Sequence, residues 1–467
     1  MRAVVCVKPN AVSGTLNPFD ECAYEAALRI PSAEVILLSM APSRYRELLL
    51  SLTRLGAKEA YLLSDAAFAG ADTLATTYTL SAALNRLRPD LVLCGRKTAD
   101  GDTGQVGTGL AARMGYALVT EVMRIDEVSD GHVTCLTRGG DTVTVPFPAL
   151  LTVERINTLR LPSIRSKVGR LTVWDAAALG AELSRCGTAG SPTRVIAACE
   201  NTADRRFCRF IEPSALRDVL LEAQRNDRRR EILPPRSEKR LGKVMTVGEN
   251  LLAAAQSIAE NVCELTDCHE EALLRRIRAE DPDAVLFDDS PNGKKLAARA
   301  ATMLETGLCA DCTGLETDEE YLTMIRPAFG GGTVAKIICL TRPALATVRT
   351  VSKNGADTVF CVGKGAGMMI ERIRALAEIN GASLAATRGA VDEGLLPYEA
   401  QVGLTGKTVS PAVYVAFGVS GAVHHIVGMR SSGTVIAVNP DKNAPIFDHA
   451  DYGICADVKT VLDTWQA

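Results

Sequence analysis

Short aliphatic runs alternate with longer segments of helical spacing along most of the sequence. Residues 33–40 and 91–94 are strand-like, and residues 73–87 between them carry apolar side chains at helical intervals. Such alternation is typical of helices that cover a largely parallel sheet. Residues 132–153 differ, because they are rich in Val and Thr and turn at Gly139-Gly140. We therefore expect an antiparallel hairpin there, within an α/β protein.

An internal repeat relates two parts of the chain. Residues 88–93 (Arg-Pro-Asp-Leu-Val-Leu) resemble residues 281–286 (Asp-Pro-Asp-Ala-Val-Leu), and similar helical segments follow at 110–114 and 296–299. A Pro-Asp pair before aliphatic residues is also a common start of a strand, so an unrelated resemblance stays open. The shared loop and helix favour two α/β domains of one ancestry, related by a pseudo-twofold axis.

The segment between the repeats has a different composition. Residues 225–240 are dense in Arg, contain Pro234-Pro235 and carry few apolar residues, which predicts an exposed linker. The chain has 467 residues, and its 52 basic and 55 acidic residues give a net charge of −3. That balance excludes a globally basic nucleic-acid binder. An aromatic content of 4% disfavours a platform for stacking single strands.

No segment predicts membrane insertion or a metal site. Residues 408–429 form the longest stretch without charged side chains, but a proline and several glycines fit a buried strand and a helix start better than a membrane span. The first residues show no signal-peptide pattern, so we expect a cytoplasmic chain whose 14 cysteines are reduced. The pair Cys309/Cys312 and the loose cluster of Cys263, Cys268 and His269 lack the second pair that a four-ligand site needs.

A glycine-rich loop, residues 95–109, follows the first copy of the repeated strand. Its glycines allow backbone N–H groups to face an anion, and the next helix adds its N-terminal dipole. The corresponding loop of the second copy, residues 288–293, holds two carboxylates and a proline, which make a poor phosphate cradle. We therefore expect a nucleotide only in the first copy, although a simple tight turn remains the alternative.

Polar residues gather after the strand-like runs of the C-terminal third. A glycine-rich turn at 363–367 follows the first run, and further polar groups follow the next ones: Arg388, Gln401, Thr405, Ser420, His424, His425, Asn439 and Asp457. The carboxyl ends of parallel strands meet at one crevice, so this pattern predicts a nucleotide cofactor. Structural roles stay open for Ser420 as a helix cap, Asp457 as a helix start and Arg388 as a surface charge. No nucleophile–base pattern indicates a catalytic residue.

At these residues the chain resembles an electron-transfer flavoprotein whose small (beta) and large (alpha) subunits are fused. The beta-like motifs are Asn17–Glu21, Gly70–Thr73, Asp100–Gly107 and Ser191–Val195. The alpha-like motifs are Thr306–Leu315, Arg326–Gly331, Arg342–Arg349, Gln401–Lys407, Gly418–His425 and Ala444–Phe447.

The resemblance implies a fold and a division into domains. The fold would be α/β, with two related adenine-nucleotide-hydrolase-like (Rossmann-like) parallel-sheet domains and a C-terminal flavodoxin/DHS-like FAD-binding domain. The domains would be a beta-like domain with a nucleotide site and a C-terminal arm at 1–224, a linker at 225–242, an alpha N-terminal-like domain at 243–352 and the FAD-binding domain at 353–467.

The resemblance also implies roles in holding FAD. Arg388 would lie over the flavin ring, Thr405 near N5, and His425, as a positive donor, by the pyrimidine carbonyl. Ser420, Gly418 and Gly421 would meet phosphate or ribityl groups, Asn439 and Asp457 would hold the adenosine half, and Gln401, Gly406 and Lys364 would complete the site. The protein would tune the flavin electrostatically while the flavin carries the chemistry.

In the beta-like half the resemblance implies a second adenine nucleotide, either AMP as a structural filler or a second FAD reduced by NADH. Its site would comprise Asp72, Thr73, Asp102, Thr103, Gln105, Val106 and Gly107. The loop favours the second FAD, and with it electron bifurcation. Partners would be an acyl-CoA dehydrogenase-like or other flavin dehydrogenase, which docks on residues 161–164, and ferredoxin or flavodoxin. The alternative is a flavin-free adenine-nucleotide-binding or sensory protein.

Overall fold

The computed structural model forms two compact units, each described here by itself. It describes residues 1–10, 13–98, 100–129, 131–154, 158–200, 206–226, 240–266, 269–318, 321–328, 333–349, 357–403 and 406–465. The first unit comprises residues 1–199, 233–329 and 334–349, and the second comprises residues 200–232, 330–333 and 350–467.

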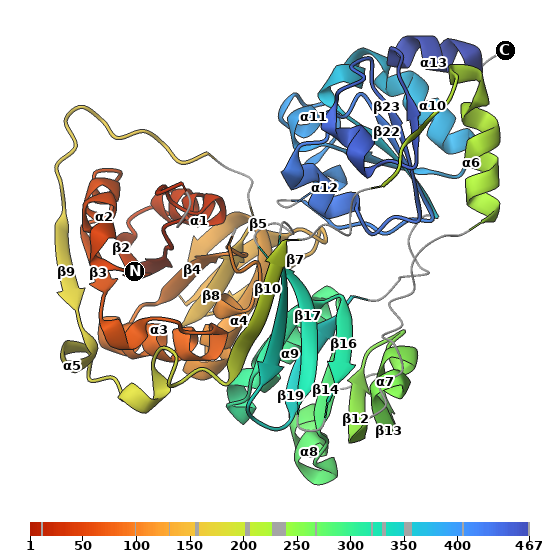
Figure 1. The fold of residues 1–467 in the computed structure, drawn as a ribbon. Coiled ribbons are helices and arrows are strands. Elements are labelled where there is room, and N and C mark those ends of the chain that lie inside the picture. The colour runs from red at the N-terminus through yellow and green to blue at the C-terminus, as the bar shows by residue number, and fades with distance from the viewer. Residues whose placement is uncertain are drawn as a thin grey trace. The chain divides into compact units, whose positions relative to one another are not determined.

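A nine-stranded sheet organises the first part of the first unit (Figure 1). Its order is β7-β6-β5-β8-β4-β1-β2-β3-β9. The strands are β1 Arg2–Cys6, β2 Glu34–Met40, β3 Glu59–Leu63, β4 Leu91–Gly95, β5 Ala117–Ser129, β6 His132–Thr137, β7 Thr142–Pro146, β8 Ala149–Val153 and β9 Arg170–Trp174. Only the β5-β6 and β6-β7 pairs are antiparallel, so the hairpin prediction is confirmed.

Helices cover both faces of this sheet. They are α1 Pro18–Leu28, α2 Arg46–Thr53, α3 Thr73–Leu87 and α4 Val106–Met114, and the short α5 Ala176–Leu179 follows β9. Alternate strand residues point to opposite faces, so Val5 packs with α1 and α2 while Val4 packs with α3 and α4. Burial on both faces explains the continuous aliphatic runs in the sequence.

A second, five-stranded sheet in the same unit repeats the centre of the first. It is entirely parallel in the order β13-β12-β14-β19-β15, which corresponds to β2-β1-β4-β8-β5 of the first sheet. Its strands are β12 Leu241–Val247, β13 Ala259–Leu265, β14 Ala284–Asp288, β15 Leu308–Cys312 and β19 Ala344–Val348, with helices α7 Leu252–Ile258, α8 Glu270–Glu280 and α9 Pro291–Leu304. The internal repeat therefore reflects two copies of one fold, and α4 of the first copy packs on α9 of the second.

A small four-stranded sheet joins segments from the two halves of the chain. Its order is β10-β18-β17-β16, with β10 Thr193–Glu200, β16 Gly314–Thr317, β17 Leu322–Ala328 and β18 Thr333–Cys339. The strand β10 comes directly after the first copy, and the other three strands belong to the second. The first copy thus lends an edge strand to the second.

The second unit holds a six-stranded parallel sheet in the order β11-β24-β23-β22-β20-β21. The strands are β11 Arg209–Phe210, β20 Thr358–Val362, β21 Ser383–Ala386, β22 Val413–Phe417, β23 Thr434–Val438 and β24 Tyr452–Ile454. The helices are α6 Leu216–Arg225, α10 Ile370–Ile379, α11 Arg388–Asp392, α12 Val423–Met429 and α13 Val458–Trp465. Helices α6, α10 and α13 pack on one face and α12 on the other.

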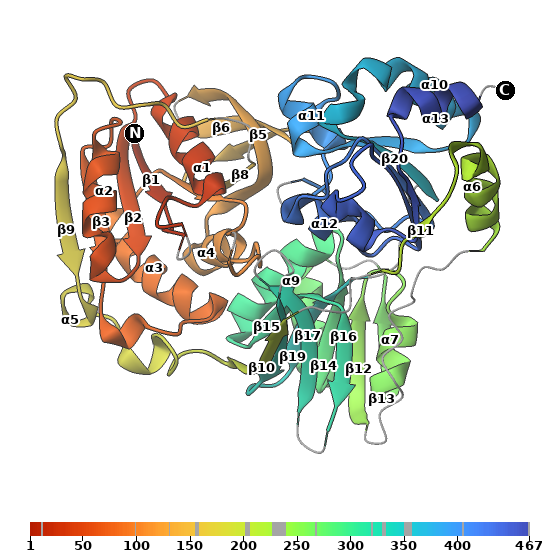
Figure 2. The same cartoon turned by 45° about the horizontal axis from the view of Figure 1, so that its top comes forward.

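The arm formed by residues 206–226 is part of this last sheet, and Figure 2 shows α6 and β11 beside its strands. Leu216, Leu220 and Ala223 of α6 are buried in the same core as Phe360 of β20. Arg206 ties the start of the arm to the sheet, because its guanidinium donates to the carbonyl oxygens of residues 430, 432 and 433 and pairs with Asp451. The domain limits expected from the sequence stay a prediction, and most of the expected linker, residues 227–239, lies outside the described residues.

The α/β fold class expected from the sequence is confirmed by these three parallel-dominated sheets. Among the described residues, every helix is too short or too polar to cross a bilayer.

Candidate functional site

The glycine-rich loop after β4 is a compact turn that leads into α4. The N–H of Asp102 donates to the carbonyl oxygen of Thr98 at 3.0 Å, and Asp102 has a φ of +51°. At Gly107, in the first turn of α4, a Cβ would lie 2.7 Å from Cγ2 of Thr152. A glycine is therefore needed for α4 to start this close to β8. Thr103 is partly buried and Val106 opens the helix.

The start of α4 has no side chain that caps it, whereas the equivalent helix of the second copy is capped. The N-cap residue of α4, Gln105, makes no capping hydrogen bond with its side chain. In the second copy, Ser290 accepts from the N–H of Gly293, and the Asp288 carboxylate accepts from the N–H and hydroxyl of Ser290 and from the N–H of Glu249. A helix N-terminus without a cap offers its N–H groups to an anion.

The Asp288 carboxylate also fills the space of the second copy's loop. A Cβ on Gly293 or on Gly248 would lie 2.1 Å from an oxygen of Asp288. In the second copy, the Asp288 carboxylate thus occupies the space that a phosphate could take in the corresponding loop of the first copy. The residues present fit a nucleotide in the first copy and do not fit one in the second.

Asp72 and Thr73, at the start of α3, have different roles beside the loop of the first copy. Asp72 caps α3, accepting from the N–H groups of Leu74 and Ala75, and its second oxygen accepts from the N–H and hydroxyl of Thr193. Asp72 therefore orders the site rather than offering a free carboxylate. Thr73 donates to Oε1 of the buried Gln105 at 3.3 Å, and among the described residues Nε2 of Gln105 has no partner. The structure brings these residues of α3 and the loop together.

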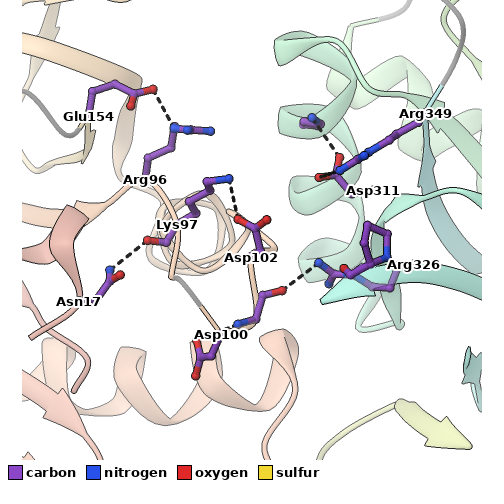
Figure 3. Close-up of polar contacts among 12 residues, drawn as sticks. Asn17, Arg96, Lys97, Asp100, Asp102, Glu154, Asp311, Arg326 and Arg349 are labelled. Carbon is purple, nitrogen blue, oxygen red and sulfur yellow. Dashed lines mark hydrogen bonds and ion pairs between the residues drawn. The ribbon is translucent and has the colours of Figure 1, made fainter. Parts of the chain in front are cut away.

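A network of charged groups surrounds the loop (Figure 3). Lys97 and Asp102 form an ion pair of 2.6 Å, and Lys8 reaches Asp100 at 2.7 Å. Arg326 of β17 donates to the carbonyl oxygen of Gly101 at 2.8 Å. Lys97 belongs to the loop expected from the sequence, whereas Arg326 was not expected at the site, because its contact with Gly101 arises only in the folded chain.

In the second unit, glycines let two loops at the carboxyl edge of the sheet meet. A Cβ on Gly363, after β20, would lie 2.1 Å from the oxygen of Gly418, after β22. Gly418 has a φ of +62° and Gly421 a φ of +90°, which side chains rarely adopt. A Cβ on Gly421 would lie 2.1 Å from the N–H nitrogen of Ile446. These contacts build a glycine-lined edge where a cofactor backbone can approach the protein closely.

Two cations stand at the rim of this edge. Arg388 begins α11 and lies 3.3 Å from the Asp392 carboxylate, and Lys364 lies 2.6 Å from Glu393. Hydrogen bonding to Glu393 raises the pKa of Lys364. Both side chains are largely exposed, so these are surface ion pairs that another anion can displace.

His425 lies inside the core of the second unit, where it is neutral. Its Nδ1 lies 3.1 Å from the carbonyl oxygen of Val402, and its Nε2 lies 3.1 Å from the Tyr414 hydroxyl. Burial lowers the pKa of His425 to about 4, against the opposing effect of the bond to Val402. Burial therefore opposes a positive charge on His425 in this structure, and its expected place by the pyrimidine carbonyl of a flavin stays a prediction.

The remaining expected flavin residues lie along the same edge. Gln401 is buried, and a Cβ on Gly406 would lie 2.3 Å from the Gln401 carbonyl oxygen. Ser420 is exposed and does not cap α12, which begins after Ala422. Asn439 donates to the carbonyl oxygen of Val419 at 2.9 Å. The N–H of Lys459 donates to Asp457, as expected of a helix start. Thr405 lies outside the described residues.

Comparison with known proteins gives these sites a family. A model described as electron transfer flavoprotein domain matches residues 4–179 and 257–358, and one described as electron transfer flavoprotein FAD-binding domain matches residues 354–430. The first covers most of both copies of the repeated fold. The second covers β20 to α12, the glycine-lined edge included.

Individual relatives agree. The electron transfer flavoprotein subunit alpha of Thermoanaerobacterium thermosaccharolyticum is 35% identical over an alignment of 243 positions, and the match covers 42% of this chain and 74% of the relative. Protein FixB of Clostridium saccharobutylicum is 34% identical over 42% of this chain and 73% of its own length. The acryloyl-CoA reductase electron transfer subunit beta of Anaerotignum propionicum is 33% identical over 42% of this chain and 74% of its own length. The resemblance noted in the sequence is confirmed at this level: the chain carries an FAD-binding domain and belongs to the electron transfer flavoprotein family.

Proposed function

We propose that this chain carries electrons on an FAD held by its C-terminal domain, and that it unites beta-like and alpha-like subunits in one polypeptide. The glycine-lined edge at Gly363, Gly418 and Gly421, within the match to the FAD-binding domain, carries the proposal. The match of one domain model to both copies of the repeated fold supports the fusion.

The chain's residues would hold FAD from several sides. The backbone of Gly418–Gly421 and Ser420 would face its phosphate or ribityl groups, and Asn439 and Asp457 its adenosine half. Gln401, Thr405 and Gly406 would border the ring. When bound, the flavin supplies the electron-accepting chemistry. Arg388 and Lys364 would lend positive charge, which favours a reduced, anionic flavin.

A second adenine nucleotide would bind at the uncapped start of α4. Its phosphate would meet the backbone of Asp102–Gly107 and the helix dipole. We propose FAD rather than AMP for this site. A second FAD reduced by NADH would allow bifurcation, with ferredoxin or flavodoxin as one acceptor and a flavin dehydrogenase as the other.

An exposed apolar loop supports a dehydrogenase partner. The side chains of Leu161 and Ile164 are 89% and 99% exposed, so they are available to a partner surface. One relative is named as an electron transfer subunit of acryloyl-CoA reductase. We propose that residues 161–164 dock an acyl-CoA dehydrogenase-like partner.

Anaerobic NADH titration with identification of the bound cofactors tests the proposal. We expect a yellow protein that releases FAD on denaturation and whose flavin band bleaches with NADH. A measured content of one FAD and one AMP per chain would contradict the second flavin and the proposed bifurcation. A colourless folded protein that takes up no added FAD would instead favour the flavin-free nucleotide-binding alternative.

A further inference from the structure

The second copy of the repeated fold holds the nucleotide loop of the first through a buried arginine. Arg326 of β17 is 5% exposed, and its Nη2 donates to the carbonyl oxygen of Gly101 at 2.8 Å. Its Nε donates to the carbonyl oxygen of Pro327. Figure 3 shows this guanidinium reaching across to the loop. A buried guanidinium that loses such an acceptor keeps an N–H donor without a hydrogen-bond partner, so breaking the contact is unfavourable in free energy.

The contact fixes one peptide plane of the loop from both sides. The carbonyl of Gly101 and the N–H of Asp102 belong to the same planar peptide and point in opposite directions. Arg326 holds the oxygen, and the carbonyl of Thr98 accepts from the N–H at 3.0 Å. The next residue, Asp102, has a φ of +51°, a backbone conformation that residues other than glycine rarely adopt. The loop therefore needs outside contacts to keep this shape.

Charges behind the loop reinforce the same conformation. Lys97 has a side chain that is 15% exposed, and it pairs with Asp102. Burial lowers the pKa of Lys97, and Asp102 opposes this effect. Asp311 of β15 lies 3.2 Å from Lys294. Burial would raise the pKa of Asp311, but the surrounding cations, Lys97 and Arg326 among them, hold it well below its usual range. The carboxylate is thus ionised, and it contacts Lys294 and Arg349 of the second copy.

We propose that Arg326 is a positioning residue for the nucleotide site, so that the second copy, which cannot hold a nucleotide itself, shapes the loop that does. This inference rests on the proposed nucleotide at α4. By fixing the peptide of Gly101 and Asp102, Arg326 keeps the loop in the conformation that leaves the first turn of α4 uncapped. Loss of Arg326 weakens nucleotide binding in the other half of the chain, 225 residues away in sequence.

The test compares the full-length variants Arg326→Gln, Arg326→Lys, Arg342→Gln and Arg349→Gln. Arg342 is the matched control, because its side chain is 72% exposed and it forms an ion pair with Asp283 of the same copy. Total FAD and AMP per chain are measured by acid release after gel filtration, and AMP binding is measured by calorimetry on nucleotide-stripped protein reloaded with one FAD.

We expect wild type and Arg342→Gln to retain two adenine nucleotides and Arg326→Gln to approach one, the FAD of the C-terminal domain. AMP should bind Arg326→Gln at least about tenfold more weakly, as expected for a lost charge-assisted hydrogen bond. Arg326→Lys, which keeps a charged donor, should recover part of the affinity. The amide of Asp102 should also exchange its hydrogen faster in Arg326→Gln.

Equal AMP affinity in wild type and Arg326→Gln would overturn the inference. So would an equal loss in Arg349→Gln, which disturbs Asp311 without touching Gly101, because a general loosening of the two copies would then explain both. If Arg326→Gln does not fold, Arg326→Lys decides, and an unchanged affinity rejects the positioning role. A wild-type chain that binds one adenine nucleotide would refute the second nucleotide site itself.

Discussion

Removing one buried side chain from the arm should destabilise the second unit, although the arm lies far in sequence from the strands β20 to β24 of the same unit. Leu220 of α6 is fully buried, in one core with Phe360 and Val415 of the last sheet. Leu220→Ala removes buried apolar atoms and leaves a cavity, so the free energy of unfolding of this unit should fall by about 3 kcal/mol. The adjacent Leu221 is 38% exposed, and Leu221→Ala should cost less than about 1 kcal/mol.

The assay is urea unfolding of the FAD-loaded protein, followed by the fluorescence of released FAD. Leu220→Ala should shift the midpoint of release to lower urea, with Leu221→Ala close to wild type. The comparison holds the helix and the residue type constant, so only burial differs. Equal midpoints for the two variants would show that α6 does not pack on the C-terminal sheet in solution, and the reasoning would fail.

Three further predictions concern charge, docking and pH. Arg388→Ala should lower the flavin midpoint potential, because it removes positive charge near the reduced flavin; a reductive titration with an unchanged midpoint would contradict this. Leu161→Ala should slow electron transfer to an acyl-CoA dehydrogenase while flavin content stays constant, whereas Leu183→Ala, also exposed, should not; equal rates for both variants would remove the docking role. Burial would raise the pKa of Glu25, but hydrogen bonds from Arg160 and Arg29 lower it to about 2, below the ordinary 4.5. The ionised Glu25 therefore stabilises the fold by on the order of 3 kcal/mol above pH 4.5, and this stabilisation is lost as the pH falls toward 2. In Glu25→Gln the free energy of unfolding should fall less steeply between pH 4.5 and 2 than in wild type. An equally steep fall in both proteins would argue against the ion pair.

The layered fold could be predicted from the sequence because its signals are local. Aliphatic strands buried on both faces and helices between them leave a pattern that can be read residue by residue. The repeat at 88–93 and 281–286 located two equivalent strands, β4 and β14. The carboxylates of residues 288 and 289 were visible in the sequence, but the place of Asp288 against Gly248 and Gly293 was not.

Other features depend on contacts between distant residues. The strand β11 has two residues and pairs only with β24, so no local pattern reveals it. The contact of Arg326 with Gly101 likewise arises only when two domains meet. The burial that lowers the pKa of His425, beside Val402 and Tyr414, arises only in the folded chain, so no sequence pattern reports it.

The first half of the chain completes two sheets that are otherwise built by the second half. It supplies β10 at the edge of one and β11, with α6, at the edge of the other. Both halves of the chain are therefore needed to complete these two sheets. Either half made alone would leave a strand edge unpaired, at β18 of the small sheet and at β24 of the six-stranded sheet.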